Sequence, residues 1–201
     1  MNTDRMEAFS DGVIAILITI MVLELRVPHG GDWTALRPML PVLLSYLLSF
    51  VFLGIYWNNH HHMMILTDEI SGAILWANLH LLFWLSLIPF GTAWMGENHV
   101  APLPTAIYGG ILLLAAIAYT ILQQAIIHRQ GAGSKLKAAV GEDRKGISSA
   151  LLYAAAIPLA FVRPLIAVAI YVVVATIWLV PDRRIEEHLS RHTEDRQTRR
   201  A

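Results

Sequence analysis

The 201-residue chain has no cysteine, few charged residues and a formal net charge of +0. Without cysteine it forms no disulfide and offers no thiolate to a metal or a substrate. Charged residues make up 15% of the chain, against about 25% in a typical soluble domain. The balanced charge provides no basic surface for nucleic acid. No nucleophile–base pair, phosphate loop or dinucleotide fingerprint occurs, so the sequence predicts neither an enzyme nor a cofactor.

Apolar sequence dominates instead, with 56% hydrophobic residues and a mean hydropathy of +0.53. A membrane-spanning helix needs about 20 mostly apolar residues. Six stretches qualify as spans, at about 4–27, 36–62, 69–95, 103–129, 147–162 and 164–180. The predicted fold is therefore an all-α integral membrane protein with six transmembrane helices. It comprises a membrane domain over residues 1–181 and a charged cytoplasmic tail over 182–201.

Lysine and arginine set the predicted orientation, because they are enriched in cytoplasmic loops. An even number of spans places both termini on one side of the membrane. That side would hold twelve of the 15 basic residues and the other side three, namely Arg26, Arg37 and Arg163. We therefore expect a multi-pass protein of the cell membrane with both termini in the cytoplasm. The polar linker at 130–146 is expected to be an ordinary basic loop on that side.

The first span carries a narrow apolar stripe. Ile16, Ile20 and Leu23 recur at spacings of four and three, which places them on one side of a helix, with Thr19 beside them. Such a stripe with one hydroxyl suits the lining of an ion pore. From the residues alone, packing against other spans or against lipid stays the alternative.

Ser10 and Asp11 lie roughly 120° and 140° away from Ile16 on the same helix, so they do not face the same pore. Asp11 could serve as an ion site or proton relay, or it could join a hydrogen-bond cluster between helices. The rotation favours the cluster. The predicted partners are Arg5 and the polar end of the second span, namely Trp57, Asn58, Asn59, His60, His61 and His62.

Three consecutive histidines do not predict a metal site. Neighbours on a helix point about 100° apart, so one helix cannot present all three to a single ion. His80, inside the third span, is expected to form a hydrogen bond between helices. Glu24 would either concentrate cations at the mouth of a pore or pair with Arg26 or Arg37.

The pattern formed by Arg5, Phe9, Ser10, Asp11, Ile16 and Thr19 resembles the transmembrane protein 175 family. That family comprises the endosomal and lysosomal potassium channels and their bacterial relatives. The resemblance implies that the first helix lines the pore, with Ile16 as its narrowest ring and a hydroxyl at Thr19 contributing to selectivity. It also implies that Phe9, Ser10 and Asp11 are tied to neighbouring helices.

The same resemblance implies a homotetramer that conducts potassium ions among membrane lipids, because a chain with one six-span unit supplies only one first helix. The family lacks the Thr-Val-Gly-Tyr-Gly filter of ordinary potassium channels, and so does this chain. The alternative function is a cation- or proton-coupled secondary transporter that uses Asp11, His80 and the histidine cluster.

Overall fold

The computed structural model describes residues 3–141 and 143–179, and all regular secondary structure in these ranges is helical. The α-helices are α1 Thr3–Leu23, α2 Trp33–Leu36, α3 Leu40–Ile65, α4 Gly72–Ser86, α5 Ile88–Glu97, α6 Pro102–Gln130, α7 Lys135–Val140, α8 Arg144–Val162 and α9 Pro164–Leu179. Two 3₁₀ turns, η1 Arg37–Met39 and η2 Gly131–Gly133, continue α2 and α6. The predicted tail at 182–201 lies outside the described residues.

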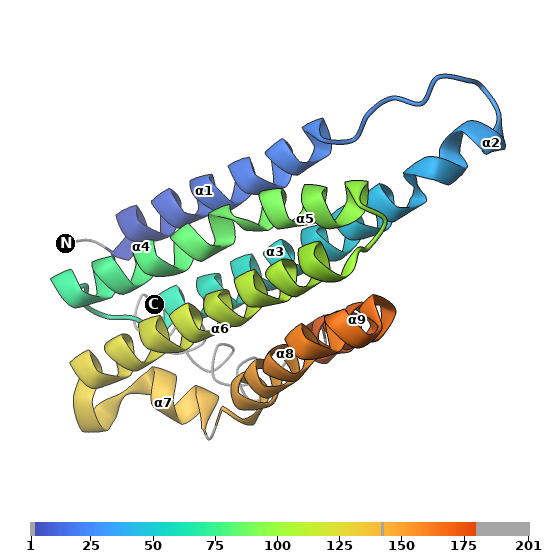
Figure 1. Cartoon of the computed structure of the whole chain (residues 1–201). Helices are drawn as coiled ribbons and strands as arrows, with labels where there is room; N and C mark the ends of the chain where they lie inside the picture. The colour runs from blue at the N-terminus through green and yellow to red at the C-terminus, as the bar shows by residue number, and fades with distance from the viewer. Residues whose placement is uncertain (1–2, 142, 180–201) are drawn as a thin grey trace.

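The helices form one elongated bundle in which α6 is the central element (Figure 1). It contacts α4, α5, α8 and α9, while α1 packs on the opposite side against α3, α4 and α5. The start of α1, the α3–α4 connection and α7 lie at one end, here named the α7 end. The α1–α2 loop lies at the other end, named the α2 end.

Five helical segments are long and apolar enough to cross a membrane, namely Thr3–Leu23, Trp33–Ile65, Gly72–Glu97, Pro102–Gly133 and Arg144–Val162. The sixth, Pro164–Leu179, is apolar but shorter, with 16 described residues. At about 1.5 Å per residue it extends roughly 24 Å, less than a hydrocarbon core of about 30 Å. The six-span count therefore stays a prediction at its last helix.

Proline shapes two of these segments. The third predicted span is divided into α4 and α5 at Leu87, directly before the Ile88-Pro89 start of α5. Pro158 lies inside α8 without ending it. Arg163 is extended, with φ −150° and ψ 104°, which is the backbone that a following proline favours. The chain turns there into α9, as the sequence predicted.

The linker at 130–146 is more ordered than the sequence indicated. Ser134 caps the short helix α7, and Asp143 caps α8 by accepting the Gly146 N–H at 3.1 Å. The buried Gln123 side chain donates to the same carboxylate at 3.2 Å. Capping side chains therefore fix the starts of α7 and α8 on either side of residue 142.

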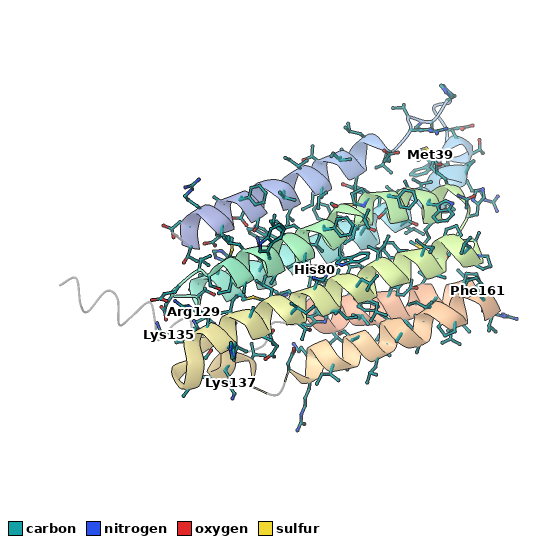
Figure 2. All side chains as sticks on the ribbon, turned by 60° about the vertical axis from the view of Figure 1, so that its left-hand side comes forward. Met39, His80, Arg129, Lys135, Lys137 and Phe161 are labelled. Carbon is teal, nitrogen blue, oxygen red and sulfur yellow. The ribbon has the colours of Figure 1, made fainter. Side chains whose placement is uncertain are left out.

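Basic side chains gather at the α7 end. Figure 2 shows Arg129, Lys135 and Lys137 there, whereas Met39 and Phe161 lie at the opposite end. Arg129 pairs with Glu69 at 2.9 Å and Lys135 pairs with Asp68 at 2.9 Å, which ties α6 and α7 to the α3–α4 connection.

Candidate functional site: the two faces of helix α1

Helix α1 presents one face to its own bundle and leaves the other face uncovered. The inner face is buried and consists of Met6, Ser10, Ile14, Leu17 and Met21. The outer face is exposed in the single chain and includes Phe9, Ile16, Ile20 and Leu23. Within each set the spacings are three, four or seven residues, which keeps the members on one side of the regular helix α1. The stripe seen in the sequence is thus the face that the bundle does not cover.

Ile16 and Leu23 are strongly exposed, at 59% and 76%. Thr19 is also exposed, and its hydroxyl donates to the carbonyl of Ala15 at 2.8 Å. A hydroxyl that donates a hydrogen bond to a carbonyl still has lone pairs that can accept one. Thr19 therefore adds acceptor oxygen to an otherwise apolar face.

A buried polar chain anchors the inner face. Asn78 of α4 donates to the Ser10 hydroxyl at 2.9 Å, and its carbonyl oxygen lies 2.8 Å from Nε2 of His60 on α3. Ser10 in turn donates to the carbonyl of Met6 at 2.9 Å. The chain Ser10–Asn78–His60 thus links α1, α4 and α3, and it fixes which side of α1 faces inward.

Asp11 follows Ser10 but does not join this chain. Its Oδ1 is buried without a hydrogen-bond partner among the described residues, and the same holds for Nδ1 of His60. Arg5 is exposed, and the ion pairs of the described residues do not include one between Arg5 and Asp11. Arg5, which the sequence offered as a partner for Asp11, therefore does not pair with it within one chain.

A second contact joins α1 to α3 at the α7 end. Nδ1 of His61 lies 2.6 Å from Oε1 of Glu7, and the Trp57 ring stacks on His61 with ring centroids 6.2 Å apart. Asn58 is exposed on α3, and Phe9 is exposed on the outer face of α1. The structure thus brings Ser10, His60 and His61 into contacts with other helices, and leaves Arg5, Phe9 and Asn58 on the surface.

Sequence reasoning missed two of these partners, Asn78 and Glu7. The signal for Asn78 was an amide inside an apolar span, which needs a partner at membrane depth. The signal for Glu7 was its position three residues before Ser10, within one turn of the same helix.

Comparisons with known proteins identify relatives of this chain. The family model described as endosomal/lysosomal potassium channel TMEM175 matches residues 5–89. A potassium channel from Chryseobacterium sp. (strain P1-3) is 53% identical over 189 residues, which cover 94% of this chain and 98% of that protein. The chain belongs to the TMEM175 family. A crystal structure of a homologue of the lysosomal potassium-selective channel TMEM175, from Chamaesiphon minutus, matches with a TM-score of 0.78 at 30% identity. The match covers 89% of this chain and 96% of that one.

Vertebrate relatives match over a smaller part. The Gallus gallus protein named endosomal/lysosomal proton channel TMEM175 is 31% identical over 101 residues, or 44% of this chain and 20% of that protein. The TMEM175 family is one of ion channels rather than enzymes. Together with the apolar helices, membership identifies this chain as a multi-pass membrane protein.

His80, which the alternative transporter function requires, lies on the surface of this TMEM175 chain. It is exposed on α4, and its Nε2 accepts the indole N–H of Trp84 from the same helix at 2.9 Å (Figure 2). The prediction that His80 bonds a neighbouring helix is therefore wrong, because its bond to Trp84 lies within α4. In the described ranges, no group of three histidine or carboxylate residues is arranged to hold a metal ion.

At the α2 end, the charges around the end of α1 are partly paired. Arg26 bonds Glu97 at 3.3 Å, and the ion pairs of the described residues include none between Glu24 and Arg26 or Arg37, which was one of the two alternatives for Glu24. Glu24 is exposed and lines a recess of about 770 Å³ together with Arg26, Glu97 and His99. Glu24 thus places a carboxylate beside the outer face of α1.

Proposed function

We propose that four copies of this chain assemble in the cell membrane into a potassium-permeable channel lined by α1. The observation that carries the proposal is the apolar face of α1 that its own bundle leaves uncovered. One first helix cannot enclose a pore, whereas four related by symmetry can. The relatives from Chryseobacterium sp. and Chamaesiphon minutus that bear the name potassium channel support the choice of ion.

In this channel Ile16 forms the narrowest ring, and Ile20 and Leu23 form wider ones. A ring of branched apolar side chains offers water and ions nothing to bind, so the barrier is the wetting of the ring. An ion must shed part of its hydration there, which potassium does more readily than sodium. The exposed Thr19 hydroxyl returns an oxygen to the ion next to this ring.

The polar chain Ser10–Asn78–His60 serves the pore indirectly. It fixes the rotation of α1 in each subunit, so that all four copies present the same residues to the axis. Arg5 and Phe9 are exposed where contacts between subunits would form. Asp11 lies next to the polar chain, and Trp57 and His61 support the α7 end.

The excess of basic residues at the α7 end supports a cytoplasmic location for that end. Both termini then lie in the cytoplasm, and potassium ions and membrane lipids are the expected partners. Residues 1–181 form the channel domain, and residues 182–201 form a cytoplasmic tail.

Reconstitution of the purified protein tests the proposal. Liposomes that contain the protein should pass potassium faster than sodium. The mass in detergent, corrected for bound detergent, should be four times the 22.4 kDa of one chain. Ile16→Asn should raise the flux and lower the preference for potassium, because amide groups let water remain in the ring.

Val22→Asn is the matched control. Val22 is also apolar and exposed, at 44%, but it lies roughly 120° from Ile16 around the helix. The Val22→Asn variant should have the same conduction and ion selectivity as the wild type. If Val22→Asn changes both properties and Ile16→Asn changes neither, the pore face is wrongly assigned. A saturable, proton-dependent flux would instead favour the coupled transporter.

A further inference from the structure

A second feature lies on the other side of the bundle from α1. Helices α3, α6, α8 and α9 enclose a pocket with an empty volume of about 450 Å³. Its walls carry five aromatic side chains, which define it here as the aromatic pocket: Phe52, Tyr56, Tyr119, Tyr153 and Trp178. None of the residues that line it belongs to α1. Whatever this pocket binds is therefore separate from the proposed pore.

The rings meet at steep angles. Tyr119 stands at 64° to Tyr56 and at 73° to Trp178, with ring centroids 6.2 Å and 6.5 Å apart. Phe52 and Tyr153 meet at 62° with centroids 6.3 Å apart. These five rings line one space and are tilted at 62–73° to one another, so they form aromatic walls on several sides of it. The electron-rich faces of such rings attract cations, and methylated ammonium ions above all.

Several polar groups of the aromatic pocket donate to the protein itself. The Tyr119 hydroxyl points at the carbonyl of Asn59 at 3.5 Å, and the Trp178 indole N–H donates to the Ser149 hydroxyl at 2.8 Å. Ser149 donates to the carbonyl of Lys145 at 2.7 Å, and the Asn59 amide donates to the carbonyl of Ile55 at 2.8 Å. The oxygens of Tyr119, Ser149 and Asn59 can still accept bonds, and the hydroxyls of Tyr56 and Tyr153 can still donate them. A ligand that combines a positive charge with an acceptor oxygen fits this set.

The charge at the edge of the pocket is negative, which suits a cationic ligand. Gly146, which lines the pocket, donates its N–H to the Asp143 carboxylate at 3.1 Å. No lysine, arginine or histidine is among the lining residues, although Arg144 and Lys145 precede Gly146 in the chain.

We propose that the aromatic pocket binds a methylated organic ammonium ion of about the size of choline. The ring walls hold the methyl groups and the charge, while Asp143 and the acceptor oxygens complement the positive sign at the edge. The proposal does not depend on the proposed channel function, because binding here requires no conduction.

The test compares choline with its neutral isostere 3,3-dimethyl-1-butanol by titration calorimetry on the full chain in detergent. The two probes have nearly the same shape and differ in charge. Choline should bind at least about tenfold more tightly, equivalent to roughly 1.4 kcal/mol. Equal affinity of the two probes, or no binding of choline at millimolar concentration, overturns the proposal without any variant.

Two variants locate the site. Trp178→Leu should weaken choline binding by about tenfold, because one aromatic wall of the pocket is lost. Trp33→Leu is the matched control, since Trp33 is exposed on α2, and it should leave the affinity unchanged. Tyr119→Phe, which keeps the ring, should retain binding, so that the result does not rest on one substitution that could impair folding. Choline affinity that survives in Trp178→Leu places the ion elsewhere and refutes the assignment.

Choline binding measured in nanodiscs of two lipids distinguishes a lipid headgroup from a soluble ion as the source of the ammonium group. A choline affinity that is lower in phosphatidylcholine than in phosphatidylglycerol nanodiscs supports a lipid headgroup as the natural occupant. Equal affinities in the two lipids support a soluble ammonium ion.

Discussion

Replacing Asn78 by leucine tests whether the buried polar chain holds α1 in place. The substitution keeps nearly the same volume and removes two hydrogen bonds, of 2.9 Å to Ser10 and 2.8 Å to His60. Hydrogen bonds between helices in membranes contribute about 0.6 kcal/mol on average and up to about 1.7 kcal/mol. Two bonds therefore set a range of roughly 1–3 kcal/mol.

The cost should be about 2 kcal/mol, in the middle of that range. Ser10 keeps its own bond to Met6, so it loses only a bond that it accepts. His60 is completely buried, and its Nδ1 already lacks a partner among the described residues. Without Asn78 neither of its ring nitrogens is satisfied, and a buried unpaired group costs about 1–3 kcal/mol.

Thermal unfolding in detergent, followed by size-exclusion fluorescence, measures the effect. For a chain of this size about 2 kcal/mol corresponds to a fall of roughly 4–8 °C in Tm. Asn58→Leu is the control, because Asn58 is exposed on the neighbouring helix, and it should change Tm little. The double variant of Ser10→Ala with Asn78→Leu should lose less than the sum of the single losses. A Tm of Asn78→Leu within one degree or so of the wild type would refute the anchoring role.

Two further predictions concern assembly and packing. Asp11→Asn, and likewise Arg5→Ala, should lower the yield of assembled tetramer on size exclusion, because Asp11 is partly buried next to the polar chain and Arg5 is exposed where subunits would meet; a normal tetramer with altered ion selectivity would instead place Asp11 in the pore. Gly109→Ala should destabilise the protein by about 1–3 kcal/mol through overpacking, because a Cβ there collides with the Tyr171 hydroxyl. Gly110→Ala meets nothing within 4 Å and should leave Tm unchanged or slightly raise it, so equal losses at both glycines would contradict the packing argument.

The course of the helices could be predicted from the sequence, because hydropathy and length decide which segments span a membrane. The two faces of α1 could also be predicted. A regular helix turns about 100° per residue, so Ile16, Ile20 and Leu23 had to share a side whatever the tertiary structure. What this reasoning could not give is which side the bundle covers, since that depends on how α3 and α4 pack.

The partners in the polar chain could not be predicted for the same reason. Asn78 was recognisable as an amide at membrane depth, but its rotation toward Ser10 and His60 is set by the packing of α4. Short-range capping was also missed. The sequence between α6 and α8 reads as a polar linker, yet Ser134 and Asp143 each satisfy free N–H groups of a following helix.

Ile14 and Ile16 mark the two faces of α1. They are the same residue type two positions apart, yet Ile14 is 1% exposed and Ile16 is 59% exposed. The polar chain through Ser10 is made on the buried face, so a rotation of α1 would break this chain and also expose apolar core residues. Both costs oppose the same movement. In the proposed channel, the outer stripe is therefore held in position by contacts that the ion would not touch, so we expect defects on the inner face to reduce assembly or stability and defects on the outer face to change flux.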